Sequence, residues 1–420
     1  MPATACLDVG STWTKGALVG DDGALLATAQ HATTPPEVLD GVKAVLSELG
    51  GADRVFACSS AGGGLRLAVV GHERLISAEA GHRVALSAGA KVVHVSAGEL
   101  DGAGIRALRD AEPDVVLLVG GTDGGDAKVL LHNASVLARN RIRPPIVLAG
   151  NEHARLEALE ILNGRTVVPT ANVLPDVGEL EPGPARAAIR QVFLNHVIGG
   201  KGLSRGTKFR DLVKAVTPDA VLNGVSQLAS EDAVLVVDVG GATTDVYSAV
   251  STRDEEERAV GLPQDRRTVE GDIGMRWSAP GIVAEAEAER LSAEGLADAA
   301  ARRATDVGFV PVTPEESEVD LKLAGLAAII AIRRHLRLVE GKLGPRGAGL
   351  LVLSGGVFRH AKDISTVVAA LRADPVLRPA IKTARIVVDR DYVLAPAGLL
   401  AENGQVEAAR KLLTRLAEDR

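Results

Sequence analysis

The sequence is poor in aromatic residues and carries no excess of positive charge. Aromatic side chains make up 2% of the 420 residues, so a stacking platform for single-stranded nucleic acid is not expected. The formal net charge is −7, whereas a protein that binds a phosphate backbone presents a basic surface. These two absences exclude nucleic acid as the expected partner. They also leave Val, Leu, Ile and Ala to form the core.

Cysteine is scarce, and long apolar runs are absent. Cys6 and Cys58 are the only two cysteines, and each lies in an apolar, strand-like run, which favours buried reduced thiols over a disulfide or a metal pair. No run approaches the roughly 18 apolar residues that span a bilayer, and the N-terminus has no basic segment of the signal-peptide type. We therefore expect a cytoplasmic protein with no membrane partner.

The strongest functional signal is the stretch Leu235–Val246, although the P-loop spacing occurs nowhere in the chain. Apolar, mostly β-branched positions predict a buried strand that turns sharply into a second strand. The turn contains acids, glycines and hydroxyl residues, namely Asp238, Gly240, Gly241, Thr243, Thr244 and Asp245. Glycine lets backbone N–H groups approach a bulky anion, and a carboxylate can hold magnesium through water. The stretch is a candidate phosphate loop.

A second stretch of this kind lies near the N-terminus. Residues 3–31 alternate like a three-stranded antiparallel meander. Its first turn carries an acid, small polar residues and a lysine, namely Asp8, Gly10, Ser11, Thr12 and Lys15. Asp8 and Asp238 are too far apart in sequence for one local motif. Two half-molecules that face each other across a cleft would bring the two turns onto one polyphosphate.

The chain length favours two lobes, because a single core usually stops growing at about 250–300 residues. Short strands alternate with helical stretches between Asp114 and Pro169, which predicts parallel βαβ units. We expect an α/β protein with four parts: a first lobe at 1–110, an inserted parallel α/β module at 111–180, a mixed helical segment at 181–232 and a second lobe at 233–420.

Three segments invite competing or provisional interpretations. Gly120–Asp126 follows a parallel strand, where ligands collect, but ordinary βα turns have the same composition. Glu270 and Asp272 precede a predicted helix, where they either face a nucleotide and metal or cap the helix. Residues 251–267 are rich in charge and are predicted to be exposed.

The order of these features resembles the actin, Hsp70 and sugar-kinase superfamily of ATPases. In chain order the sequence has the two hairpins, a small-residue helix over 319–338, a strand that ends in Ser354-Gly-Gly-Val357 and a second small-residue helix after Pro396. The resemblance implies a fold in which two ribonuclease-H-like lobes clamp Mg-ATP.

Within that superfamily the sequence resembles the MutL family associated with glutamate mutase, which is unrelated to the mismatch-repair proteins of the same name. Five segments carry the resemblance, namely Cys6–Lys15, Leu118–Asp126, Val237–Val246, Glu270–Arg276 and Leu353–Val357. It implies an ATP-driven reactivating chaperone that replaces damaged cobalamin in an adenosylcobalamin-dependent mutase or aminomutase. None of the nine histidines lies in an Asp-x-His-x-x-Gly motif, the motif by which base-off mutases ligate cobalt. The chain is therefore expected to serve a cobalamin enzyme rather than to be one.

The resemblance also implies roles for single residues. Asp8 and Asp238 would position magnesium and its waters, and Lys15 would neutralise phosphate charge. The β- and γ-phosphates would be cradled by Gly10, Ser11, Thr12, Gly240, Gly241, Thr243 and Thr244, and adenosine would be backed by Gly355 and Gly356. Asp8, Asp238 and Asp245 are all candidates for orienting the attacking water. The alternative on this scaffold is a small-molecule kinase or an ATP-dependent amidohydrolase.

Overall fold

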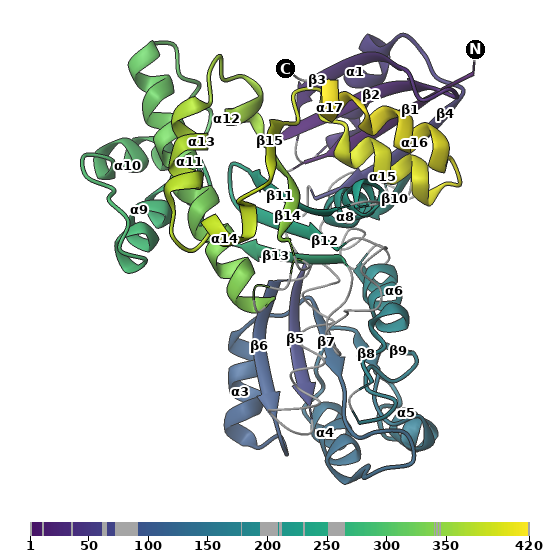
Figure 1. The fold of residues 1–420 in the computed structure, drawn as a ribbon. Coiled ribbons are helices and arrows are strands. Elements are labelled where there is room, and N and C mark those ends of the chain that lie inside the picture. Colours follow the sequence, from purple (N-terminus) through teal and green to yellow (C-terminus); the bar gives the residue numbers. More distant parts are fainter. Residues whose placement is uncertain are drawn as a thin grey trace.

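The computed structural model shows two lobes and a projecting module (Figure 1). It describes residues 2–10, 12–34, 37–60, 65–71, 91–177, 179–193, 209, 212–229, 232–250, 265–339, 341, 343 and 346–418. Within these ranges, no helix combines the length and the apolar composition that crossing a membrane requires.

The first lobe is built on a five-stranded sheet with the strand order β10-β4-β1-β2-β3. Its elements are β1 (Ala3–Val9), β2 (Trp13–Gly20), β3 (Leu25–Ala32), α1 (Val38–Leu49), β4 (Arg54–Ser59), β10 (Val213–Val216) and α8 (Thr217–Leu228). The strands β1, β2 and β3 are antiparallel, as the alternation predicts, whereas β4 and β10 run parallel to β1. Every residue of β1 is buried, so this strand lies at the centre of the lobe.

The second lobe repeats this topology with the strand order β13-β12-β11-β14-β15. Its elements are β11 (Ala233–Val239), β12 (Thr244–Ala249), β13 (Asp265–Glu270), α9 (Ala279–Ala288), α10 (Ala297–Thr305), α11 (Pro314–Leu338), β14 (Ala348–Ser354), α12 (Gly356–Arg359), α13 (Ser365–Ala373), α14 (Arg378–Ile381), β15 (Arg385–Val388), α15 (Leu394–Glu402), α16 (Val406–Leu413) and α17 (Arg415–Glu418). Three antiparallel strands are again followed by two parallel ones. Two ribonuclease-H-like lobes of the actin and Hsp70 type are thereby confirmed.

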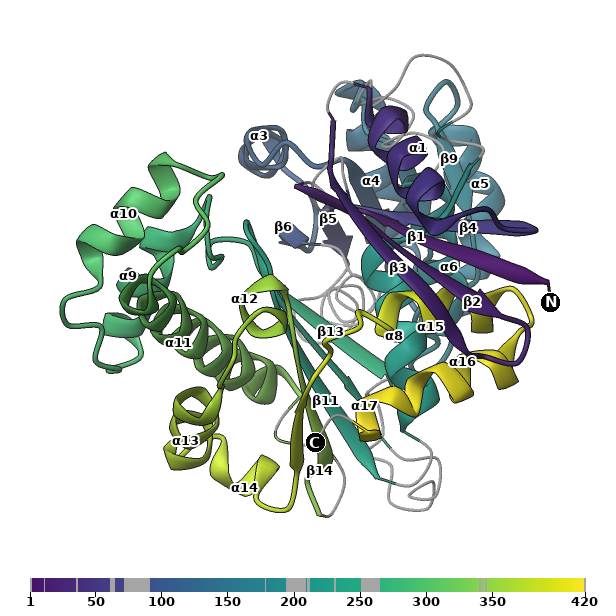
Figure 2. The same cartoon turned by 90° about the horizontal axis from the view of Figure 1, so that it is seen from above.

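The helices α8 and α15 pack against each other between the two sheets (Figures 1 and 2). Each follows the last parallel strand of its lobe. A Cβ atom placed on Gly224 would lie 2.2 Å from the carbonyl oxygen of Leu394, and one on Gly398 would lie 1.7 Å from that of Ala220. Backbone therefore meets backbone at this crossing. The chain then continues into α16, which lies beside the strands of the first lobe (Figure 1).

The inserted module has a wholly parallel sheet with the order β6-β5-β7-β8-β9, and it projects away from the two lobes (Figure 1). Its elements are β5 (Arg66–Gly71), β6 (Lys91–Ala97), α3 (Gly102–Asp110), β7 (Val115–Leu118), α4 (Lys128–Arg139), β8 (Ile146–Leu148), the 3-10 turn η1 (Glu152–Ala154), α5 (Arg155–Ile161), β9 (Val167–Pro169) and α6 (Pro182–Val192). The expected boundary at 111 assigned β5 and β6 to the first lobe. The structure corrects it, because both strands hydrogen-bond into the module's sheet. Residue patterns mark strands but not the sheet that they join.

Helix α6 joins the module to the rest of the molecule. Its apolar face packs on the module's sheet. On the opposite side, Arg190 donates to Asp219 of α8 and to Glu402 of α15, at 2.6 Å in each case. Arg186, one turn earlier, pairs with Asp265 of β13 at 3.3 Å. One helix thus connects the module with both interlobe helices and with the second lobe.

The described end of segment 251–267 is buried, so the prediction that it is exposed is wrong there. Arg266 and Arg267 on β13 are 9% and 5% exposed, while residues 251–264 lie outside the described ranges. Arg267 forms an ion pair with Asp245 on the neighbouring strand at 2.5 Å. Charged composition usually indicates solvent, but this cross-strand carboxylate compensates the buried guanidinium.

His335 near the end of α11 is fully buried between the helix and the second-lobe sheet. Its ring nitrogens lie 3.0 Å from Thr268 Oγ1 and 2.8 Å from Ser248 Oγ. Burial, together with the charge of Arg266, lowers the pKa of His335 to about 3. The imidazole is therefore neutral in the folded protein at neutral pH.

This buried imidazole predicts a loss of stability in acid. Below pH 6.5 His335 is protonated in the unfolded chain, whereas in the folded chain it stays neutral down to about pH 3. The free energy of unfolding therefore decreases as the pH falls from 6.5 to 3. The contribution lost between pH 7 and pH 5 is about 2 kcal/mol. Urea unfolding across pH 4–7 should show a shallower pH dependence for His335→Gln. The variant His153→Gln, at an exposed position, is the matched control, and equal slopes for wild type and His335→Gln would contradict the prediction.

Candidate functional site

The two predicted phosphate turns have the same local structure. The turn after β1 is closed by Gly10 N–H donating to the Trp13 carbonyl at 3.0 Å, and the turn after β11 by Gly240 N–H donating to the Thr243 carbonyl at 2.9 Å. The cross-strand register pairs Asp8 with Lys15 in the first hairpin. In the second hairpin it pairs Asp238 with Asp245. Corresponding positions of the two lobes therefore carry the candidate groups.

The fold brings the two turns together. A Cβ atom placed on Gly241 would lie 3.8 Å from Thr12 Oγ1 and 3.9 Å from Arg276. The side chain of Thr12 is exposed, so its hydroxyl is open to a ligand. The N–H of Arg276 donates to the Gly241 carbonyl at 2.7 Å, which fixes the second turn. Ser11, the remaining candidate in the first turn, lies outside the described residues.

Asp238 lies among charged groups from both lobes. It ends β11 beside Ser354 of β14 and is only partly exposed. Burial raises the pKa of the Asp238 carboxyl, and the nearby Asp245 and Asp8 carboxylates add to the shift, while Lys15 and a hydrogen bond from Ser354 oppose it. Lys15 and Asp8 belong to the first lobe, so the cleft concentrates negative charge around one lysine. Such a field attracts a divalent cation.

Asp8 is almost fully buried, and its oxygens already accept hydrogen bonds. Thr217, the first residue of α8, donates to Oδ1, and Cys58 Sγ lies 3.6 Å from the same oxygen. Tyr392 donates to Oδ2 at 2.5 Å. Burial raises the pKa of Cys58 well above its usual range, so this thiol is a structural neighbour and not a nucleophile.

The other second-lobe candidates have partners of their own. The Asp245 carboxylate is held by Arg267 through hydrogen bonds of 2.9 and 2.5 Å, and Thr243 Oγ1 lies 3.3 Å from the other carboxylate oxygen. The Thr244 hydroxyl is buried and donates to the Ile273 carbonyl at 3.0 Å. The Thr244 hydroxyl is therefore already engaged within the second lobe.

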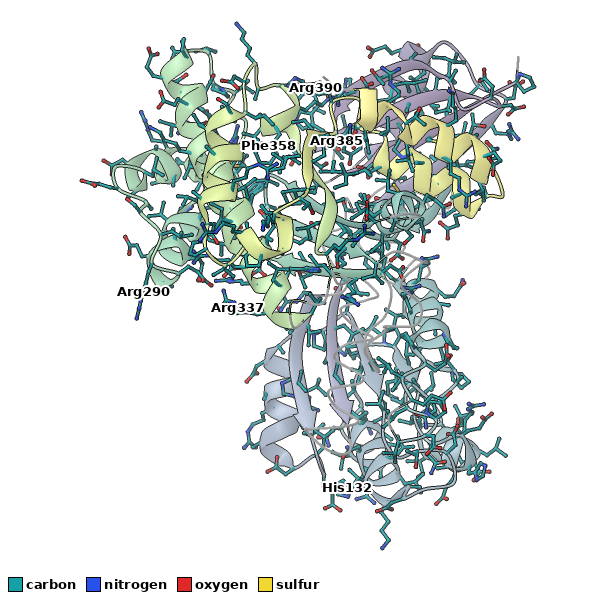
Figure 3. The ribbon with its side chains drawn as sticks, viewed as in Figure 1. His132, Arg290, Arg337, Phe358, Arg385 and Arg390 are labelled. Carbon is teal, nitrogen blue, oxygen red and sulfur yellow. The ribbon has the colours of Figure 1, made fainter. Side chains whose placement is uncertain are left out.

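The loop after β14 passes close to the end of β11. Gly355 has φ +113°, and a Cβ atom there would lie 2.3 Å from the Val239 carbonyl oxygen, so no side chain fits. A Cβ atom on Gly356 would meet no atom within 4 Å, which leaves space beside the backbone. Phe358 of α12, which follows this loop, is fully buried (Figure 3). Its packing fixes the start of α12.

Two residues at this site, Asp389 and Tyr392, were not predicted from the sequence. Asp389 directly follows β15 and accepts the backbone N–H groups of Val393 and Leu394 at 2.8 and 3.4 Å. Burial raises the pKa of Asp389 to about 6, with Asp238 adding to the shift and Lys15 opposing it. An Asp just before a helix was the available signal, but it indicates a helix cap equally well.

The donor set fits magnesium bound together with a nucleotide. Among the described residues, no group of three or more His, Cys, Asp or Glu side chains could hold a metal ion by itself. Nucleotide-bound magnesium, however, keeps several waters and needs only one or two carboxylates besides the phosphates. Asp238, partly exposed, meets that need directly. Asp8 is already engaged by Thr217 and Tyr392, so it suits contact through water.

The structure bears on two of the alternatives left open by the sequence, namely the role of Glu270 and the role of the 120–126 loop. Glu270 pairs with Arg334 of α11 at 2.5 Å and stands opposite Thr244 in the strand register. The N-terminal cap position of α9 is Ser278, so Glu270 does not cap that helix. In the module, Asn172 donates to the Gly121 carbonyl and to Asp123 at 2.9 Å. Asn151 donates to the Gly125 carbonyl at 2.9 Å. The 120–126 loop is therefore held by buried amides, as a structural turn would be.

Known proteins resemble this chain over nearly its whole length. A sequence model of the family described as MutL protein matches residues 4–416. A curated relative, "Protein MutL" of Clostridium tetanomorphum, is 34% identical over 454 residues, which cover 98% of both chains. The nucleotide-free structure of acetone carboxylase has a TM-score of 0.43 at 13% identity, covering 95% of this chain and 70% of the other. The activator of 2-hydroxyisocaproyl-CoA dehydratase from Clostridium difficile, with bound ADPNP, has a TM-score of 0.33 at 10% identity, covering 99% and 96%.

Proposed function

Because the chain belongs to the MutL protein family, we propose that it is an ATP-hydrolysing reactivating chaperone for an adenosylcobalamin-dependent mutase or aminomutase of the glutamate mutase type. The observation that carries the proposal is the close approach of the two hairpins, where a Cβ atom on Gly241 would lie 3.8 Å from Thr12 Oγ1. There Lys15 and Asp8 of the first lobe influence the ionisation of Asp238 in the second. A polyphosphate held at this place contacts both lobes at once.

Each group at the cleft has a role in nucleotide binding. The turns with Gly10, Ser11 and Thr12 and with Gly240, Gly241, Thr243 and Thr244 supply backbone N–H groups to the phosphates, and the exposed Thr12 adds its hydroxyl. Lys15 neutralises phosphate charge, and the open space beside Gly356 receives the adenosine, with Gly355 behind it. Asp238, and Asp8 through water, would hold magnesium, which would supply further charge neutralisation. Phosphoryl transfer requires little more than such positioning and neutralisation.

The residue that orients the attacking water is assigned by elimination among the three candidate acids. Asp245 is neutralised by Arg267, and Asp8 is covered by Thr217 and Tyr392. Asp238 is the remaining candidate, and it is partly exposed. We assign the positioning of the attacking water to Asp238, which shares the cation with Asp8, and the support of the second hairpin to Asp245.

The interlobe helices and α6 supply a route from nucleotide to partner. Closure of the lobes around a nucleotide changes the crossing of α8 and α15. Arg190 of α6 is bonded to both helices, and α6 packs on the module. The module projects from the lobes (Figure 1) and is the part available to a large partner. These contacts favour a remodelling ATPase over a small-molecule kinase.

The test uses the full chain and a glutamate mutase that has been inactivated with its damaged cobalamin in place. With MgATP and free adenosylcobalamin, mutase activity should return, and phosphate release should rise when mutase is added without any small substrate. The non-hydrolysable analogue ADPNP should bind without restoring activity. Binding itself can be followed by tryptophan emission, because the only two tryptophans, Trp13 and Trp277, are 44% and 61% exposed and directly follow Thr12 and Arg276 at the cleft. ADP formation only after a sugar or acid is added would instead establish the kinase.

A further inference from the structure

Tyr392 contacts both charged groups of the first hairpin. It lies two residues before α15, and its hydroxyl donates to Asp8 Oδ2 at 2.5 Å. Its ring lies beneath Lys15, with Nζ 3.6 Å from the ring centroid. The three side chains line one small cavity together with Arg359. A single residue of the second half of the chain therefore engages the acid and the base that the first lobe offers to a nucleotide.

The backbone of Tyr392 is in an unfavourable conformation. Its φ is +56°, in the left-handed region that bulky L-residues avoid. The other non-glycine residues of the described chain with positive φ are Glu112, Arg141 and Arg290, and all three are exposed. Tyr392 is partly buried at a functional site, where such strain persists only if the surroundings hold it. The holding contacts here are those to Asp8 and Lys15 on one side and the Asp389 cap of α15 on the other.

The hydroxyl of Tyr392 acts as a donor. Burial and the nearby Asp8 charge raise the pKa of Tyr392 well above its usual range, so the phenol keeps its proton. A cation that shares Asp8 through its water shell needs the same carboxylate oxygens. A phosphate that attracts Lys15 forms a charge-assisted hydrogen bond, which is stronger than the attraction of the ammonium to the ring. A bound magnesium nucleotide therefore competes with Tyr392 for both of its partners, Asp8 and Lys15.

We propose that Tyr392 is a positioning residue that holds Asp8 and Lys15 in the absence of nucleotide and releases both to bound magnesium nucleotide. The inference rests on the proposed function. Release removes the contacts that maintain the positive φ, so the turn relaxes and the first turn of α15 moves with it. Occupancy of the phosphate site is thereby transmitted to the crossing of α8 and α15.

Two variants separate the two contacts of Tyr392. Tyr392→Phe removes only the hydroxyl, so Asp8 is already free and MgADP should bind about tenfold more tightly, with ADP in EDTA unchanged. Tyr392→Asn also removes the ring while tolerating the left-handed backbone, so ADP in EDTA should bind more tightly as well. Titration calorimetry measures all four affinities. Hydrogen exchange of α15 amides should change on MgADP binding in the wild type and should not change in Tyr392→Asn.

The other tyrosine provides the control. Tyr247 is buried on β12 near Arg267 and makes no hydrogen bond to Asp8 in the described structure, so Tyr247→Phe should leave the ratio of MgADP to ADP affinity unchanged. If Tyr392→Phe weakens binding equally with and without magnesium, Tyr392 is only a packing residue and the inference is overturned. If wild type binds MgADP but Tyr392→Phe behaves identically, the inference alone fails. If wild type binds no magnesium nucleotide, the proposed function fails with it.

Discussion

The Asp238→Asn variant is expected to lose magnesium-dependent ATP hydrolysis by about 10²–10³-fold while it folds normally. An amide at this position accepts from Ser354 but supplies no negative charge to a cation. Burial and the neighbouring Asp8 and Asp245 carboxylates raise the pKa of Asp238, so its ionised form is held at a cost in stability. The variant should therefore unfold at the same temperature as wild type or higher. Phosphate release and thermal unfolding, measured on the same preparations, check both halves of the prediction.

A matched control lies at the other end of the same strand. Asp232 precedes β11, is exposed and pairs with Arg346 at 2.9 Å. Exposed ion pairs contribute about 0–1 kcal/mol, so Asp232→Asn should keep both the hydrolysis rate and the unfolding temperature. Full hydrolysis by Asp238→Asn would remove the assignment of this cleft. A parallel fall in the stability of both variants would mean that strand β11 itself had been damaged.

The hairpins and the strand ends were predictable because their signals are local. Strand β1 and strand β11 are apolar runs that end in an acid and a glycine, and a strand followed by a sharp turn is specified within about ten residues. The repetition of this pattern at Asp8 and Asp238 gave the two-lobed fold. The turn geometry then followed, since Gly10 and Gly240 close equivalent turns.

The remaining parts of the site depend on contacts between distant segments. Tyr392 and Asp8 are 384 positions apart in the sequence. Hydrophobic periodicity reports only local structure, so it does not predict a contact between such distant residues. Arg267 is charged and would be expected at the surface, but it is buried because Asp245 pairs with it. Strands β5 and β6 were recognisable as strands but not as members of the module's sheet. Sequence therefore predicted the two candidate phosphate turns, whereas the contacts of Tyr392 and Arg267 were visible only in the structure.

The buried acids of the cleft have a common explanation. Asp8, Asp238 and Asp389 lie at the ends of β1, β11 and β15, where the backbone brings them together without regard to their mutual repulsion. Ionisable groups in such a cluster destabilise the fold, and they persist where they serve a ligand. A nucleotide-bound cation, as proposed for this site, would relieve the repulsion. Lys15 partly does so in its absence, which agrees with its location among the three carboxylates.

The second large effect is expected at the helix crossing, where Gly398→Val should destabilise the protein by about 3 kcal/mol or more. Glycine inside a helix costs about 1 kcal/mol relative to alanine, yet α8 and α15 each carry one at the point of contact. A Cβ atom at Gly398 would lie 1.7 Å from the Ala220 carbonyl oxygen. Because that oxygen belongs to the backbone of α8, it cannot move aside as a flexible side chain can. The two helices must separate, and the cleft that they position must open. Urea unfolding and MgADP affinity should therefore fall together.

Gly325 on α11 distinguishes this packing effect from the general consequences of replacing a helical glycine. A Cβ atom at Gly325 would meet only Val367 at 3.8 Å, which is an ordinary contact. Gly325→Ala should therefore stabilise the protein by about 0.5–1 kcal/mol through helix propensity, and it should leave nucleotide affinity unchanged. If Gly398→Val proves as harmless as Gly325→Ala, the two interlobe helices cannot be in backbone contact. The route from the phosphate turns through α15 to α6 would then lose its physical basis, because a loosely packed crossing transmits no displacement.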